Sequence, residues 1–134
     1  MIKLYLQCAI WDRMSGVVEG KFEKYQCTNL ALFTSQLIKD KALPMSCLKK
    51  VEFADMNKNL ALFMKSLIKD LLNEPNEKKR YLPFSLISAD SKLSMLRESL
   101  RLFMHRFIIK SKKETDSMMK SRAEEAEHAL MTTK

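Results

Sequence analysis

The sequence contains only two glycines, Gly16 and Gly20, among its 134 residues, although glycine usually makes up roughly 7% of a chain. Glycine most readily takes the positive φ angles that tight hairpins and phosphate-binding loops require. A sandwich of many hairpins is therefore disfavoured, and neither G-x-G-x-x-G nor G-x-x-x-x-G-K-[ST] occurs. Leucine, lysine, glutamate and ten methionines favour helices instead, so the sequence predicts an all-α chain.

Apolar residues that recur every three or four positions predict the helices. We expect them over residues 2–14, 22–40, 44–53, 55 or 57 to 72, 79–88 and 92–109, with a loop from Gly16 to Gly20. The predicted buried stripes are Leu30, Phe33 and Leu37 beside Ala31 and Ile38; Leu60, Phe63, Met64, Leu67, Ile68 and Leu71; and Leu93, Leu96, Leu100, Phe103 and Phe107. Asp55 or Asn57, and Asp90 or Ser91, are the expected helix caps.

The pattern changes after Lys110. A chain of this length holds one core, and we assign it to a folded domain over residues 1–110. Residues 111–134 are polar, so they form either a charged tail or a loosely attached helix. Their thin apolar stripe is Met118, Met119, Ala123, Ala126 and Leu130.

An internal repeat links two of the predicted helices. Residues 29–40 read NLALFTSQLIKD and residues 59–70 read NLALFMKSLIKD, so nine of twelve positions match, and residues 100–109 carry a weaker echo. Repeats of this period in a helical chain predict stacked helical hairpins, each burying one face against its neighbour.

Chemistry-bearing residues are sparse. We interpret His105 as a partly exposed surface histidine beside an apolar stripe, and His128 lies in the polar tail, where Glu124, Glu125 and Glu127 form a solvated face. No cysteine lies within six residues of a histidine. Cys8, Cys27 and Cys47 form no C-x-x-C pair, so we expect free thiols rather than a zinc site. The sequence therefore predicts no enzyme, catalytic residue, metal or cofactor.

The net charge of +8 suggests an acidic partner or a solvated basic surface. Lys78, Lys79, Arg80, Arg97 and Arg101 are the candidate RNA contacts, although no aromatic stacking platform accompanies them. The methionines are interpreted as core filling. Since no run of about 18 apolar residues occurs, no membrane span is predicted.

Four collinear strings suggest a family. They are Ile10-Trp11-Asp12, Asn29-Leu30 at an expected helix start, Lys41-Ala42-Leu43 followed by Leu48 to Phe53, and Leu96 to Phe103. Together they resemble the C-terminal MA-3 domain of the nucleolar MIF-4G-domain proteins, which are relatives of translation initiation factor 4G. The resemblance covers roughly residues 5–110 of this sequence.

The resemblance implies a fold and a function. The fold would be a HEAT-like stack of antiparallel helical hairpins without an active site. The function would be docking of a DEAD-box RNA helicase of the initiation factor 4A type during small-subunit ribosome biogenesis in the nucleus and nucleolus. One alternative is a basic helical domain that contacts pre-ribosomal RNA directly, and another is a structural or oligomerisation fragment.

Family members present their helicase-binding loops near one turn of this sequence. The implied contact residues are Leu43, Pro44, Ser46, Lys49, Lys50, Glu52 and Asp55. The alternative for Glu52 and Asp55 is that they only cap or solvate a helix. Compared with the family, the chain lacks the MIF-4G half and the first MA-3 helix, so we expect a fragment that self-associates weakly through residues 2–14.

Overall fold

A computed structural model describes residues 2–111 and 116–131, except the side chains of residues 2–4 and 55. The described residues form helices and turns with no strand among them, so the predicted all-α fold class is confirmed. The α-helices are α1 (Ile2–Val18), α2 (Lys24–Lys39), α3 (Lys58–Leu72), α4 (Glu77–Ser88), α5 (Ser94–Met104) and α6 (Ser117–Met131). Short 3-10 helices cover Met45–Lys50, Phe53–Asp55 and Ser91–Leu93, and a π-helical turn covers His105–Ile109.

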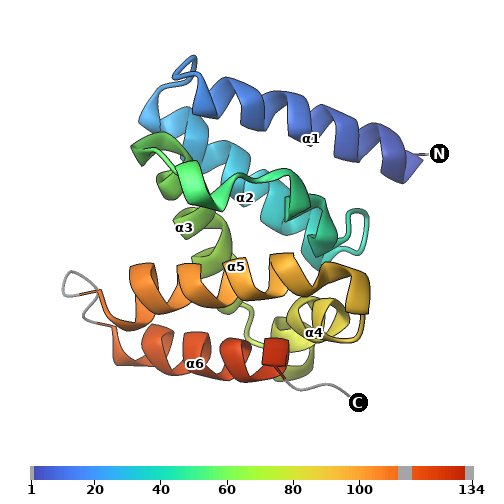
Figure 1. The fold of residues 1–134 in the computed structure, drawn as a ribbon, viewed down its shortest axis with the longest axis vertical. Coiled ribbons are helices and arrows are strands. Elements are labelled where there is room, and N and C mark those ends of the chain that lie inside the picture. The colour runs from blue at the N-terminus through green and yellow to red at the C-terminus, as the bar shows by residue number, and fades with distance from the viewer. Residues whose placement is uncertain (1, 112–115, 132–134) are drawn as a thin grey trace. The chain divides into compact units, whose positions relative to one another are not determined.

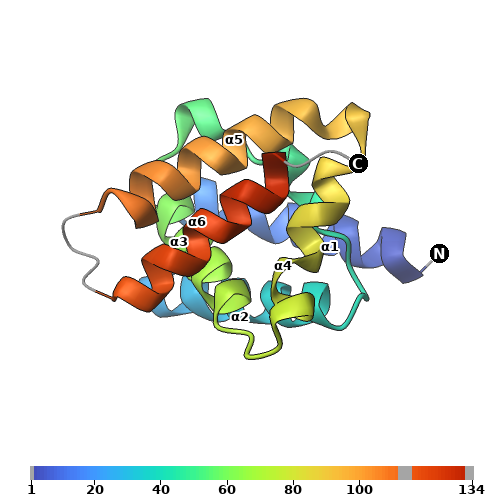
Figure 2. The same ribbon diagram turned by 90° about the horizontal axis from the view of Figure 1, so that it is seen from below.

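The chain divides into two compact units, residues 1–70 and residues 71–134. In the first unit, α1 and α2 run antiparallel through a short connecting turn (Figure 1). In the second unit, α5 and α6 run antiparallel, and α6 packs against both α4 and α5 (Figure 2). A HEAT-like stack of these hairpins and a domain boundary at residue 110 stay predictions.

The first helix is longer than the predicted range 2–14, since it continues to Val18. Gly16 therefore lies inside α1 and not in the predicted loop. The ring of Phe22 packs against it, and a Cβ atom at Gly16 would lie 2.9 Å from Phe22 Cε2. Gly20 does lie in the turn, where its φ of 77° is one that other residues rarely adopt.

α2 buries a different face from the one that its apolar residues predict. The buried side chains are Cys27, Ala31, Thr34, Ser35 and Ile38. Ala31 and Ile38 are buried as predicted, whereas Leu30 and Leu37 are only half-buried and Phe33 is 56% exposed, so the predicted stripe is only partly right. The inner face of α2 therefore consists mostly of small side chains. The buried hydroxyl of Thr34 is satisfied, because it donates to the Leu30 carbonyl at 2.8 Å.

α3 buries the stripe that the sequence predicts. Its residues Leu60, Phe63, Met64, Leu67, Ile68 and Leu71 are at most 2% exposed. Asn57, one of the two expected caps, accepts the Leu60 backbone N–H at 2.9 Å. The short helix expected over residues 44–53 forms instead as two 3-10 segments, with Val51, which is extended, and Glu52 between them.

The two repeat copies lie at different depths in their helices. Asn29 is inside α2, so the helix start that the family strings place at Asn29-Leu30 is wrong. Asn59, its counterpart, is the second residue of α3. The copies meet at their ends, where Lys39 Nζ of the first lies 3.1 Å from Asp70 Oδ2 of the second. Both side chains are more than two thirds buried. This ion pair therefore joins the C-terminal ends of the two repeat copies.

α4 begins two residues before the predicted start. Asn76 caps it by accepting the Lys79 backbone N–H at 3.0 Å. Pro83 lies inside the helix and does not end it, although proline removes one backbone hydrogen bond at that position. The predicted end of the preceding helix at residue 72 is confirmed, since α3 ends at Leu72 and residues 73–76 lie between the two helices.

The helix predicted over residues 92–109 is divided into a 3-10 turn, α5 and a π-helical turn. Asp90 caps the first of these by accepting the Lys92 N–H at 2.9 Å. Three of the five predicted stripe residues, Leu96, Leu100 and Phe103, are buried. The half-buried ring of Phe107 stacks on Phe103 with 4.7 Å between centroids.

The C-terminal segment contains a packed helix. The buried residues of α6 are Met119, Ala123, Ala126 and Leu130, which are four of the five in the predicted stripe; Met118 is exposed. Arg122 Nη1 donates to the Leu72 carbonyl at 2.8 Å, which satisfies one of the orphan carbonyls at the end of α3. Across the described ranges, no helix is long and apolar enough to span a bilayer.

The packing of α6 can be tested with Ala126→Glu. Ala126 is fully buried, so the new carboxylate would lose hydration without gaining a partner. We expect the free energy of unfolding to fall by about 2 kcal/mol or more. Ser121→Glu is the matched control, because Ser121 is exposed on the same helix, and it should stay within about 0.5 kcal/mol of the parent. Equal effects of the two substitutions in urea titrations would contradict the packing.

Candidate partner-binding groove

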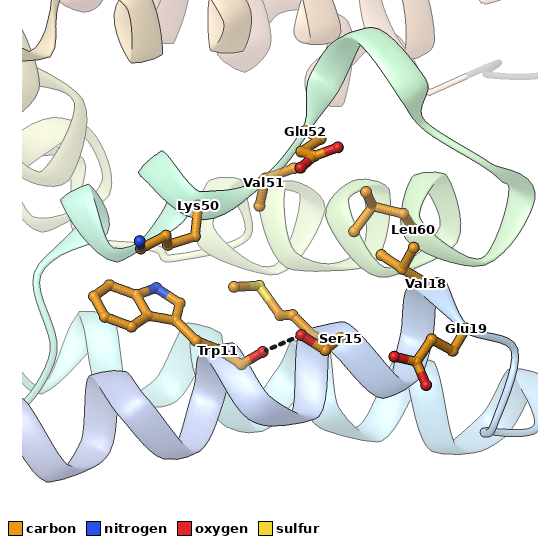
Figure 3. Close-up of a pocket in the computed structure, with 9 residues that line it drawn as sticks. Trp11, Ser15, Val18, Glu19, Lys50, Val51, Glu52 and Leu60 are labelled. Carbon is orange, nitrogen blue, oxygen red and sulfur yellow. Dashed lines mark hydrogen bonds between the residues drawn. The ribbon is translucent and has the colours of Figure 1, made fainter.

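A groove in the first unit is bounded by α1, the segment after the Met45–Lys50 3-10 helix, and the start of α3 (Figure 3). Its volume is about 360 Å³. We call it the Trp11 groove; it is lined by Trp11, Met14, Ser15, Val18, Glu19, Lys50, Val51, Glu52 and Leu60. Figure 3 shows Lys50 and Trp11 together at one end and Val18 and Glu19 at the other.

Two hydrogen bonds hold the walls of the groove in place. Trp11 Nε1 donates to the Cys47 carbonyl at 2.7 Å and so joins α1 to the 3-10 helix. At the other end, Asn57 Nδ2 donates to the Val18 carbonyl at 2.8 Å. Because Asn57 also caps α3, it connects the end of α1 to the start of α3. The groove is therefore formed before any partner binds.

Charges surround an apolar floor. Lys50 Nζ lies 5.3 Å from the centroid of the Trp11 ring, a cation–π arrangement that orients the ammonium group. Glu52 stands on the segment opposite α1, and Glu19 pairs with Lys21 at 2.9 Å on the exposed surface. An apolar side chain could enter between the walls, while flanking charges of either sign would find an opposite charge at the rim.

The groove offers no catalytic arrangement. Its only hydroxyl, that of Ser15, donates to the Trp11 carbonyl at 3.2 Å within α1 (Figure 3). In the part of the chain that the structure describes, no group of three or more His, Cys, Asp or Glu residues could hold a metal ion.

The contact residues expected from the family resemblance differ in their exposure to solvent. Pro44, Lys49, Lys50 and Glu52 are exposed, Ser46 is half-buried, and Leu43 is buried. The side chain of Asp55 lies outside the described residues. Two of the set, Lys50 and Glu52, line the Trp11 groove, and Leu43 can act only by holding the turn in place.

The candidate RNA contacts have unequal surroundings. Lys78 and Lys79 are exposed in the first turn of α4. Arg80 is 8% exposed and donates to the carbonyls of Glu74 and Pro75 at 2.7 and 3.0 Å, so it has a structural role. The remaining two are half-buried: Arg97, and Arg101, whose guanidinium lies 3.1 Å from Glu98 and 3.7 Å from Glu127.

Sequence reasoning missed half of the groove. Trp11 is the only tryptophan and stands in one of the family strings, which could have identified it. Val18 and Glu19 were assigned to a loop, although α1 reaches Val18 and aims this end at the groove. The role of Asn57 was expected as a cap, but its bond to Val18 joins residues 39 apart in sequence and has no local signal.

The thiols differ in their protonation. Burial raises the pKa of Cys27, and it raises the pKa of Cys47 to about 12. Only the thiolate reacts readily with alkylating reagents. Cys8 is exposed on α1.

We expect one thiol to react with a disulfide reagent at pH 8 in the native protein, and three after denaturation. The fast thiol should disappear in Cys8→Ser and persist in Cys47→Ser. Because Cys47 ionises near 9 when unfolded and near 12 when folded, its contribution to stability is present below pH 9. That contribution is lost as the pH rises from 9 to 12. Reaction of Cys47 in the folded protein at pH 8 would contradict its burial.

Asn57→Ala tests how the groove is held together. The change removes the bond to Val18 and the cap of α3, so we expect a loss of about 1–2 kcal/mol in unfolding free energy. Asn73→Ala, at an exposed position in the turn after α3, is the control and should change stability little. A loss no larger than that of the control, measured by denaturant titration, would show that the two Asn57 hydrogen bonds contribute nothing to stability.

Comparison with known proteins gives one consistent result. The chain is 33% identical to mouse nucleolar MIF4G domain-containing protein 1 over 108 residues, and 35% identical over 107 residues to its Drosophila melanogaster homolog. It is 31% identical to the human protein over 109 residues. Each match covers 80–81% of this chain and 12% of the relative. No family model and no solved structure matches. Over about four fifths of its length, the chain is therefore homologous to one segment of nucleolar MIF4G domain-containing protein 1.

Proposed function

We propose that this chain is a non-catalytic adaptor that docks a DEAD-box RNA helicase of the initiation factor 4A type in nucleolar small-subunit ribosome assembly. Homology to a protein named for its nucleolar location and its MIF4G domain supports the compartment and the adaptor role. The helicase is the partner implied by the MA-3 resemblance of the sequence.

One observation carries the proposal. Two of the contact residues that the resemblance implies, Lys50 and Glu52, line a preformed groove with an apolar floor. Preformed, largely apolar concavities with a few placed charges are typical of binding sites. Because the walls are fixed by the Trp11 and Asn57 hydrogen bonds, binding would cost little ordering of the backbone.

Docking would use the two parts of the groove differently. An apolar side chain of the partner would lose contact with water between Met14 and Leu60, which line the groove. The exposed charges Lys49, Lys50 and Glu52 would then set the orientation and the rate of encounter. Rim charges of this kind act mainly on specificity and association rate, so their effects should depend on salt.

Direct binding of pre-ribosomal RNA is the second candidate. The exposed pair Lys78 and Lys79, at the start of α4, and the net charge of +8 favour it. RNA binding of this kind weakens steeply as salt increases, since it releases counterions. The two candidates use different units of the chain and can be separated.

The charge reversal Lys49→Glu with Glu52→Lys keeps the net charge and changes one groove residue, Glu52, and the exposed Lys49 beside the groove. We expect it to weaken binding to an initiation factor 4A-type helicase at least tenfold, measured by calorimetry. Its matched control is Glu77→Lys with Lys78→Glu on α4, where both residues are exposed, and this variant should bind the helicase like the parent. Both variants should retain the helical circular dichroism spectrum.

The same pair of variants tests the RNA alternative. If the α4 variant loses affinity for a structured RNA while the groove variant retains it, and the parent binds no helicase, the adaptor proposal is wrong. Unchanged helicase binding by the folded groove variant would remove the Trp11 groove from the proposal.

A further inference from the structure

The outward side of α2 is apolar at its centre and carries no basic residue. We call it the α2 outer face; its residues are Tyr25, Asn29, Leu32, Phe33, Gln36 and Asp40, all exposed. At 3.6 residues per turn these six positions fall on one side of the helix and its C-cap. Tyr25, Leu32 and Phe33 are 66%, 42% and 56% exposed.

Comparison within the repeat shows that this exposure is unusual. Phe33 and Phe63 hold the same position in the two copies, yet Phe63 is fully buried. On the opposite side of α2, Ser35 is buried and its hydroxyl has no hydrogen-bond partner among the described residues. α2 therefore buries an unsatisfied hydroxyl and exposes an aromatic ring, both of which cost stability in an isolated chain.

Charge limits what can cover this face. The chain carries +8, so two copies repel each other overall. The α2 outer face has no lysine or arginine and only one carboxylate, that of Asp40. It is therefore a surface on which a second copy can approach without facing like basic charges.

The order of the residues is self-complementary about its middle. If two copies of α2 pack antiparallel with a two-fold axis between positions 32 and 33, Leu32 and Phe33 meet their counterparts at the centre. Asn29 then faces Gln36 of the second copy, where two side-chain amides can pair. Tyr25 faces Asp40 of the second copy, where the phenol can donate to the carboxylate. Within one copy, Gln36 Nε2 donates a hydrogen bond to Asp40 Oδ1 at 3.0 Å.

We propose that the α2 outer face is a homodimer interface in which two α2 helices pack antiparallel. An isologous contact of this kind closes on itself and produces dimers, not filaments. The antiparallel arrangement also opposes the two helix dipoles favourably. One helical face is smaller than the roughly 800 Å² per partner of a stable complex, so dimers should form only at high protein concentration.

Sedimentation equilibrium of the full chain tests the proposal. The parent should show a monomer–dimer equilibrium, and Phe33→Glu should weaken it at least tenfold, because two carboxylates would meet near the axis. Tyr5→Glu is the matched control: Tyr5 is 77% exposed on α1 and lies in the 2–14 edge that the sequence alone suggests. Tyr5→Glu should dimerise like the parent.

A second pair of variants tests the register. Asn29→Lys with Gln36→Glu should retain the dimer, since each lysine would face a glutamate of the second copy. Asn29→Lys with Gln36→Lys should abolish it. A parallel pairing would weaken the dimer in both variants, because residue 29 would meet residue 29 of the second copy, residue 36 would meet residue 36, and like charges would face each other in each case. A parent that stays monomeric at millimolar concentration, or that loses its dimer in Tyr5→Glu and keeps it in Phe33→Glu, would overturn the proposal.

Discussion

The hydrogen bond from the Trp11 indole to the Cys47 carbonyl is the interaction on which the first unit depends most. The 3-10 helix that it holds has poorer hydrogen-bond geometry than an α-helix and gains order from this external contact. It brings Lys50 over the Trp11 ring and thereby places the charged rim beside α1. Without it, this segment would be held beside α1 by its buried side chains, such as Leu48, and the groove wall that carries Lys50 and Glu52 would be less firmly fixed.

Local patterns predicted most of the helices because their signals lie within a few residues. The stripe of α3, the Asn57 cap and the break after Leu72 follow from spacing and side-chain chemistry alone. The predicted helix boundaries were wrong where side-chain packing determines the end of a helix. Gly16 was expected in a loop, but the ring of Phe22 packs against it inside α1, and the two glycines alone do not indicate that contact.

The face that α2 buries shows a second limit of predicting structure from sequence. Its largest apolar residues describe one face, and the packing of the unit buries a neighbouring face that also carries Cys27, Thr34 and Ser35. Periodicity reports which side chains are apolar, while burial also depends on contacts with elements distant in sequence. The groove shows the same limit, since Lys50 and Glu52 were expected from family resemblance, whereas Val18 and Glu19 become neighbours of them only in the folded chain.

The unequal burial of the repeat also bears on how its two copies can change over time. In the second copy, Phe63 is enclosed on all sides, so a substitution there must also fit the residues around it. In the first copy, Phe33 meets solvent, and its identity can drift or be selected without loss of the fold. Duplicated helices of this kind provide one stretch of sequence that maintains the scaffold and a second that is available for new contacts.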